Sequence, residues 1–360
     1  MAKLDIALVT NMTTPYRAPF YEALTALDEV NSLRVYTCVD RECDRQWDVK
    51  PARGYDIKKL WGFTINLARG DDANRILHFR FGIFWQLFRN RPSVVVIGDA
   101  SWTSFLTVAA CLLLRIPYIV WNEITTSSKI SYGLVHRLRL WMYRNAAHLV
   151  AACTLAKNYL VENGVSQARI TIINNAVDND YFLTQKQKKE SLRAQFRAQL
   201  GVREDAYCYI YVGQLVSRKR VVETVEYVAE QAKHRPCHLL VVGSGPLENE
   251  MRLKANELSF SAITFCGYAN QECLCELYIA SDCLVLLSED EPWGMVVNEA
   301  LLFDKPFVAS ESVGAAVDLL GVNKNSILLS KKKIERAEED GLATPQTMAM
   351  RFSGVIRHNV

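Results

Sequence analysis

Short, continuous runs of hydrophobic residues alternate with helix-length stretches along this chain, and this alternation limits the folds that it can adopt. Six runs lie in the first half and five in the second; they begin at Leu4, Arg34, Val94, Tyr118, His148 and Ile170, and then at Cys208, His238, Ile263, Cys283 and Pro306. Continuous hydrophobicity is typical of parallel strands covered by helices on both faces. The sequence therefore predicts an α/β protein with two doubly wound parallel sheets in tandem.

A polar and charged segment over residues 178–205 separates the two sets of runs. Inside it, Leu192, Phe196 and Leu200 recur every four residues, as on one face of a helix, and Gly201 suits the C-terminal cap of that helix. At 360 residues the chain has room for two domains of roughly 150 residues each. We predict a first domain over 1–180, a second over 181–330 and a helical tail over 331–360.

The composition is that of a soluble globular protein, with half of the residues hydrophobic and 22% charged. A net charge of +3 is far below the excess of a dedicated nucleic-acid binder, so no nucleic-acid partner is expected. The ten cysteines form no CxxC pair, which favours buried thiols in a reducing cytosol and no metal site. The first residues show no secretory signal, and the most apolar run, 105–114, is too short to span a membrane. We therefore expect a cytoplasmic protein.

The segment EDEPWGMVVNEALLF follows directly after the apolar run at Cys283. Pro292 and Gly294 break the chain into a loop, and residues 295–303 are predicted to form a helix. The first amides of that helix, together with its dipole, make an anion site suited to a diphosphate. Glu291 precedes the helix and Glu299 lies within it, so the two carboxylates can reach different parts of one extended ligand.

Glu291 and Glu299 form a Glu-x7-Glu motif, and the chain resembles the family 4 retaining glycosyltransferases. Similar blocks occur in the order expected for that family: TPYRAPFYEAL, WNE and INNAVDNDYF in the first half, then YVGQLVSRKR, VVGSGPL, FCGYANQECLCELYIASD and PFVASESVGAAVDLL. The resemblance covers about 4–329. It implies the GT-B fold, in which two Rossmann-like domains face each other across a cleft. It also implies transfer of a sugar from a UDP- or GDP-sugar, used as co-substrate without a further cofactor, to a glycan or lipid-linked acceptor in surface polysaccharide or glycolipid biosynthesis.

The resemblance assigns the donor site to the second domain. Glu299 would hold the ribose hydroxyls and Glu291 the hydroxyls of the donor sugar. Arg218 and Lys219 would clamp the diphosphate, and such a cationic clamp can replace a divalent metal when negative charge develops on the leaving group. The remaining residues assigned to donor binding are Gly213, Gly243, Tyr268, Leu274, Gly294, Met295, Val296 and Val297.

The acceptor side is assigned to the first domain, where the sequence departs from the family pattern. Asn122 and Glu123 stand where a histidine often follows the fourth strand. Glu123 is our candidate for the general base or acceptor-orienting residue, with Asp99 in reserve. Arg17 would meet the acceptor or the phosphates, although a structural role for it is equally consistent with the sequence.

Each assignment has a structural alternative. Arg218 and Lys219 suit a solvated helix start, Glu299 a buried ion pair, and the glycines ordinary turns. The segment from Arg75, RILHFRFGIFWQLFRNR, suits either a helix packed on the first sheet or an interfacial helix that gives peripheral membrane contact. The oligomeric state is left open by the sequence.

Three other functions compete with glycosyl transfer. A GT-B epimerase or phosphorylase shares the expected fold, and a non-catalytic bilobal sugar-binding protein would share the cleft. An oxidoreductase reading of GSGPLE fails because Glu248 replaces the third glycine of the dinucleotide motif, where a carboxylate would repel pyrophosphate.

Overall fold

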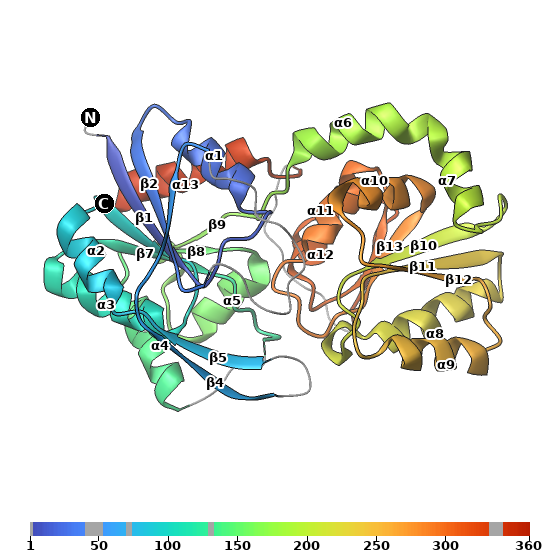
Figure 1. Ribbon diagram of the computed structural model, residues 1–360, viewed down its shortest axis with the longest axis horizontal. Helices are drawn as coiled ribbons and strands as arrows, with labels where there is room; N and C mark the ends of the chain where they lie inside the picture. The colour runs from blue at the N-terminus through green and yellow to red at the C-terminus, as the bar shows by residue number, and fades with distance from the viewer. Residues whose placement is uncertain (1–2, 40–52, 70–73, 129–132, 331–340) are drawn as a thin grey trace. The chain divides into compact units, whose positions relative to one another are not determined.

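The computed structural model describes residues 3–39, 53–69, 74–128, 133–330 and 341–360, without the side chains of 66–76. The chain divides into two compact units, each with its own sheet (Figure 1). The first unit comprises Met1–Val177 and Ala343–Val360, and the second comprises Asp178–Leu342. Among the described residues, no helix is both long enough and apolar enough to cross a bilayer.

The first unit contains a seven-stranded parallel sheet in the order β3-β2-β1-β6-β7-β8-β9 and a separate antiparallel pair, β4-β5. The strands are β1 Leu4–Thr10, β2 Val30–Thr37, β3 Asp56–Lys59, β4 Phe63–Arg69, β5 Asn74–Phe79, β6 Val94–Ile97, β7 Tyr118–Asn122, β8 His148–Ala151 and β9 Ile170–Ile172. The helices are α1 Ala18–Thr25, α2 Gly82–Asn90, α3 Trp102–Leu114, α4 Leu134–Asn145, α5 Thr154–Glu162, the short η1 Gln167–Arg169 and α13 Pro345–Asn359. The central strands β6 and β8 are buried along their whole length, as continuous hydrophobicity requires.

The second unit contains a six-stranded parallel sheet in the order β12-β11-β10-β13-β14-β15. The strands are β10 Tyr207–Val212, β11 Cys237–Val242, β12 Ile263–Gly267, β13 Cys283–Leu286, β14 Phe307–Ser310 and β15 Ile327–Leu329. The helices are α6 Asn179–Lys189, α7 Arg193–Gln199, α8 Val221–Ala232, α9 Glu248–Glu257, α10 Gln271–Ala280, α11 Met295–Leu302 and α12 Gly314–Asp318, with short turns η2 Glu190–Leu192 and η3 Ser217–Lys219. The strand order reverses between β10 and β13, so the loops that follow these two strands leave the sheet side by side.

The prediction of two doubly wound α/β units is confirmed, and each predicted hydrophobic run overlaps a strand. Strands β3, β4 and β15 were not predicted. β3 is exposed and has no continuous apolar run, the start of β4 alternates apolar and polar residues, and the apolar run of β15 is only three residues long. The segment from Arg75 was predicted to be one helix. That prediction is wrong for its first part, since Asn74–Phe79 is a strand paired with β4 and the helix begins only at Gly82.

The boundary and the tail differ from the predicted domain limits. The structure divides the chain after Val177, whereas the sequence predicts a boundary after residue 180. The lysines of the predicted tail, Lys331 to Lys333, lie outside the described residues. The final segment is helical but belongs to the first unit, where α13 packs against α1.

The apolar face of α13 explains this return. Met348, Ala349, Phe352, Val355 and Ile356 are all buried in the core of the first unit. Their spacing is that of an amphipathic helix, and a capping box at Thr344 fixes where the helix begins. The ring of Phe352 lies 5.4 Å from that of Phe20 and 4.8 Å from that of Trp121, measured between centroids.

We expect Phe352→Ala to lower the free energy of unfolding of the first unit by about 3 to 5 kcal/mol, because removal of the ring leaves a cavity in the core of that unit. Met350→Ala on the same helix is the matched control, since Met350 is 57% exposed and should cost little. Calorimetry of the full chain measures both variants. Equal melting temperatures for the two variants would contradict the packing of α13 on the first unit.

Candidate functional site

Two loops meet at the carboxyl edge of the second sheet, one after β10 and one after β13. The backbone N–H of Glu289 donates to the carbonyl oxygen of Arg218 at 2.8 Å, and the Arg218 guanidinium donates to the carbonyl oxygen of Asp290 at 3.2 Å. Lys219 forms an ion pair with Glu291. The structure therefore brings together Arg218, Lys219 and Glu291, which the sequence analysis assigned to one site.

The Lys219–Glu291 pair is largely withdrawn from water. The side chain of Lys219 is 11% exposed and that of Glu291 is 15% exposed. The hydroxyl of Ser288 also donates to Glu291, at 3.4 Å, and this contact was not anticipated from the sequence. Removing one partner from such a pair is costly because the other charge is left in a poorly hydrated place.

Helix α11 starts beside this pair, at Gly294. The residue has φ of +94°, a left-handed conformation that favours glycine. A Cβ atom at this position would lie 3.2 Å from Glu291 Cγ and 3.2 Å from Val313 Cγ1, so both side chains would have to shift by a few tenths of an ångström to admit it. The Val297 N–H donates to the carbonyl oxygen of Gly294 at 3.0 Å, and the amides at the start of the helix ahead of it can bind an anion. Met295 and Val296 are half-buried and Val297 is fully buried, as expected if only the amides of this segment meet a ligand.

Glu299 lies on the inner side of the same helix and is fully buried. The hydroxyl of Tyr278 donates to its Oε2 atom at 2.8 Å, whereas its Oε1 atom has no hydrogen-bond partner in the described part of the chain. Burial raises the pKa of this carboxyl group to about 7, and the Tyr278 hydrogen bond opposes that rise. Unlike Glu291, Glu299 makes none of its described contacts with Lys219 or Arg218.

The other residues assigned to the donor site follow strands of the same sheet. Gly213 and Gly243 directly follow β10 and β11, and a Cβ atom on Gly243 would lie 1.9 Å from the carbonyl oxygen of Gly213. Close packing of the two turns therefore requires Gly243 whether or not a ligand binds there. Tyr268 follows β12 and is 53% exposed, while Leu274 is buried in the first turn of α10.

In the first unit, three segments after β1, β7 and β9 form one polar network. The guanidinium of Arg17 lies 3.7 Å from the ring centroid of Trp121 and is ion-paired with Glu123. The Asn175 side chain accepts from Arg17 at 3.0 Å and donates to Glu123 Oε1 at 3.0 Å. Arg17 and Glu123 therefore lie together as candidates for the acceptor side. Asn175 was not singled out from the sequence, although it lies in the INNAVDNDYF block directly after a strand.

Asp99, the reserve candidate, takes part in local structure at the start of α3. Its Oδ1 atom accepts from the backbone N–H of Ser101 at 3.0 Å and from the hydroxyl of Ser104. Its buried Oδ2 atom has no described hydrogen-bond partner. No described contact joins Asp99 to the Arg17–Glu123 network.

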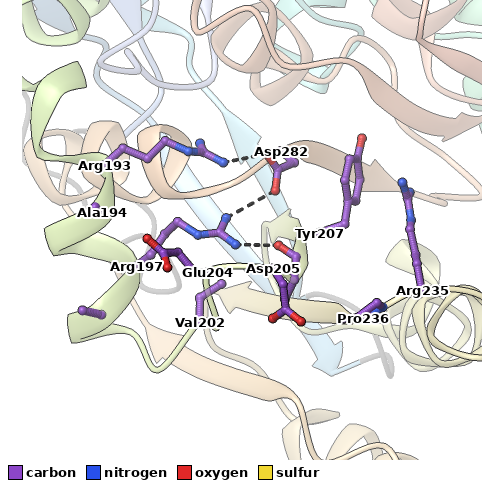
Figure 2. Close-up of a pocket in the computed structure, with 12 residues that line it drawn as sticks. Arg193, Ala194, Arg197, Val202, Glu204, Asp205, Tyr207, Arg235, Pro236 and Asp282 are labelled. Atoms are coloured by element: carbon purple, nitrogen blue, oxygen red, sulfur yellow. Dashed lines mark hydrogen bonds and ion pairs between the residues drawn. The ribbon is translucent and has the colours of Figure 1, made fainter.

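A cavity of about 690 Å³ lies at the opposite, amino edge of the second sheet (Figure 2). Arg193 and Arg197 both point to Asp282 there, with N–O distances of 2.6 and 3.3 Å. Arg197 also donates to the carbonyl oxygen of Ala280 at 3.0 Å. These contacts fasten α7 to the start of β13, and none of the predicted donor residues lines this cavity.

The described cysteines and acidic residues form no further candidate centre. Burial raises the pKa of the Cys111, Cys208 and Cys283 thiols to about 12, which makes them poor nucleophiles. Among the described residues, no three His, Cys, Asp or Glu side chains gather where they could hold a metal ion.

The buried carboxyl of Glu299 predicts a pH-dependent stability. Because its pKa is raised from 4.5 to about 7, its full contribution to stability is present below pH 4.5 and is lost as the pH rises to 7. Glu299→Gln keeps the shape of the side chain but cannot ionise. The free energy of unfolding of this variant, relative to that of the wild type, should therefore rise by up to about 3 kcal/mol between pH 5 and pH 8. Urea denaturation at several pH values measures this difference. The exposed Glu250→Gln is the control, and a Glu299→Gln profile parallel to the wild type would refute the prediction.

Two family profiles match the chain, one in each half. Residues 45–181 match glycosyltransferase family 4, and residues 193–341 match the family described as glycosyl transferases group 1. An uncharacterized glycosyltransferase of Methanocaldococcus jannaschii is 28% identical over 138 residues, which are 38% of this chain and 35% of that protein. The alpha-D-kanosaminyltransferase of Streptomyces kanamyceticus is 28% identical over 138 residues, 38% of this chain and 33% of that enzyme. These alignments span only about a third of the relatives' length.

Solved structures share the fold over nearly the whole chain. Anabaena HepE in complex with UDP-glucose has a TM-score of 0.63 at 15% identity, covering 99% of this chain and 90% of that one. A glycosyltransferase from Rickettsia africae has a TM-score of 0.64 at 14% identity, with coverage of 99% and 88%. The UDP-GlcNAc 2-epimerase of Methanocaldococcus jannaschii has a TM-score of 0.56 at 14% identity, with coverage of 98% and 99%. Identities this low establish the fold alone, and the family profiles add the family. This chain therefore belongs to the family 4 glycosyltransferases and has their GT-B fold.

Proposed function

We propose that this protein is a retaining glycosyltransferase that moves a sugar from a nucleotide-sugar donor to a hydroxyl of a glycan or lipid-linked acceptor. The observation that carries the proposal is the Lys219–Glu291 pair, with Arg218 beside it, at the start of α11. Anabaena HepE has been solved with UDP and with UDP-glucose, which supports a uridine nucleotide over a guanosine one. Surface polysaccharide or glycolipid biosynthesis is the setting that we propose.

The donor's diphosphate would lie against the amides of α11, Lys219 and Arg218. When the nucleoside diphosphate departs, negative charge grows on its terminal phosphate oxygen, and fixed cations and amide dipoles stabilise that charge. In this proposal Lys219 and Arg218 supply the positive charge that a divalent metal would otherwise provide.

Lys219 and Glu291 would exchange partners when the donor binds. In this structure each neutralises the other in a largely buried position. A sugar diphosphate offers each of these two side chains a new partner, because its phosphate can bind the Lys219 ammonium and its sugar hydroxyls can donate to the Glu291 carboxylate. The exchange avoids the cost of leaving either charge buried and unpaired.

Retention of configuration would follow from attack on the leaving-group face. The acceptor hydroxyl forms its bond to the anomeric carbon as the bond from that carbon to the phosphate oxygen breaks, and the hydroxyl proton passes to the departing phosphate. No enzyme nucleophile is required, so positioning supplies much of the rate enhancement. We propose that Arg17, Glu123 and Asn175 orient the acceptor, because these three side chains are already held by one another.

We propose a cytoplasmic location. Support comes from the buried thiols of Cys111, Cys208 and Cys283, which belong to no disulfide and suit a reducing compartment.

An epimerase is the second candidate, because the UDP-GlcNAc 2-epimerase of Methanocaldococcus jannaschii has the same fold. The two functions differ in products. An epimerase converts the donor sugar in the absence of acceptor, whereas the proposed transferase releases a nucleoside diphosphate and lengthens an acceptor. Chromatography of nucleotide sugars incubated with the protein alone separates these outcomes.

Donor binding is the first test of the proposal. In a thermal-shift panel of UDP, GDP, ADP and their sugars, we expect UDP and UDP-sugars to raise the melting temperature, by an amount that corresponds to about 2.7 kcal/mol at 100 times Kd. Lys219→Ala should abolish the shift because it removes the main cation of the clamp. Arg252→Ala on the exposed face of α9 is the charge-matched control and should keep the shift. If no nucleotide stabilises the wild type, the donor site is refuted.

Transfer should depend on both members of the ion pair. We expect Glu291→Gln and Lys219→Ala each to lower the rate of nucleoside diphosphate release on the order of 10²-fold or more, with the double variant little worse than either. Arg252→Ala should leave the rate unchanged, and excess EDTA should not inhibit the wild type. Normal turnover in both single variants, or full inhibition by EDTA, would overturn the assigned roles.

A further inference from the structure

Five large aromatic side chains of the first unit are exposed to solvent. Trp61 is 78% exposed, Phe63 50%, Phe81 41%, Trp85 59% and Phe88 58%. We call this set the aromatic surface. Single exposed apolar residues are ordinary, but several neighbouring rings point to a binding surface.

Helix α2 presents three of these rings on one face. Phe81 immediately precedes the helix and Trp85 and Phe88 lie within it, so the three rings have the spacing i, i+4 and i+7. The opposite face packs into the first unit through Ile83 and Leu87, both fully buried. The sequence left two alternatives for this segment, a helix packed on the first unit and an interfacial helix. One face of α2 suits the first alternative because it packs, and the other face suits the second because it is exposed to solvent.

The start of β4 continues the same surface. The N–H of Gly82 donates to the carbonyl oxygen of Trp61 at 3.0 Å, and a Cβ atom on Gly82 would lie 2.9 Å from the Trp61 backbone nitrogen. The ring of Phe63 lies 5.8 Å from that of Phe81. The rings of the strand and of the helix therefore form one continuous area, with α2 and β4 both labelled in Figure 1.

The charged side chains around this area are mostly basic. Arg89 follows Trp85 by four residues, so it lies on the same face of α2. The exposed charged residues described over 53–65 and 77–98 are Arg53, Lys58, Lys59, Arg89 and Arg91, against one carboxylate, Asp56. Tryptophan rings with flanking cations suit the headgroup region of a membrane whose lipids are anionic.

We propose that the aromatic surface docks the first unit on an anionic lipid bilayer, with α2 lying in the plane of the interface and its rings among the lipid headgroups. An amphipathic helix with one packed face and one open aromatic face suits that position. The proposal rests on the proposed function only for its purpose, which is to bring the protein to a lipid-linked acceptor. The docking itself is measured without donor or acceptor.

Vesicle flotation of the full chain tests the proposal. We expect the wild type to float with vesicles of phosphatidylcholine and phosphatidylglycerol, and to float much less with phosphatidylcholine alone or at high salt. Trp85→Ser combined with Phe88→Ser should lower the bound fraction about tenfold or more, since two rings no longer leave water. Arg89→Gln should weaken binding to the anionic vesicles only.

The controls separate docking from folding and from catalysis. Leu253→Ser removes an exposed apolar side chain of the second unit, 62% exposed, and should float like the wild type. The double variant should nearly keep the melting temperature and should keep the nucleotide-induced thermal shift of the wild type, because both rings are more than half exposed and the donor residues belong to the second unit. Equal flotation of the double variant and the wild type overturns the proposal. A wild type that floats with neither kind of vesicle also overturns it. If that wild type is a dimer and the double variant is a monomer, the aromatic surface binds a second copy of the chain instead.

Discussion

The ion pair between Lys219 and Glu291 is the interaction on which the geometry of the candidate site depends. It joins the loop after β10 to the loop after β13, which the reversal of strand order places side by side. The adjacent bond from the Glu289 N–H to the Arg218 carbonyl oxygen fixes the register of the two loops. Because the pair is mostly buried, each charge holds the other in place, and a ligand enters at low cost only if it satisfies both.

The loop before α11 and α11 itself each carry one carboxylate, and the two lie in opposite environments. Glu291 stands before the left-handed turn at Gly294 and faces a cation, whereas Glu299 lies inside the core against Tyr278. A carboxyl group with a pKa near 7 and one oxygen lacking a described partner can either donate or accept a hydrogen bond. Such a group suits hydroxyl ligands better than phosphate. That chemistry agrees with the ribose role assigned by resemblance, although the side chain points inward in this structure.

The sequence predicted the buried strands of both sheets and the start of α11. Hydrophobic runs locate buried strands because both faces are covered, and Gly294 before an apolar segment correctly locates the start of α11. The same reasoning cannot find the exposed strand Asp56–Lys59, nor can it separate a strand from a helix within Asn74–Asn90, where the apolar residues suit both. It also cannot show that Glu299 faces Tyr278, because that contact joins residues of two different helices. A helical tail was predicted, but the sequence did not show that its last helix packs on the first unit.

That return links the end of the chain to the acceptor-side network. Phe352 of α13 packs on Trp121, and the same indole ring carries the guanidinium of Arg17. Trp121 is 3% exposed, so its position is set by the core and not by solvent. Arg17 in turn holds Glu123 and Asn175. The last helix therefore does more than close the hydrophobic core: it supports, through one aromatic ring, the polar side chains that we assign to orienting the acceptor.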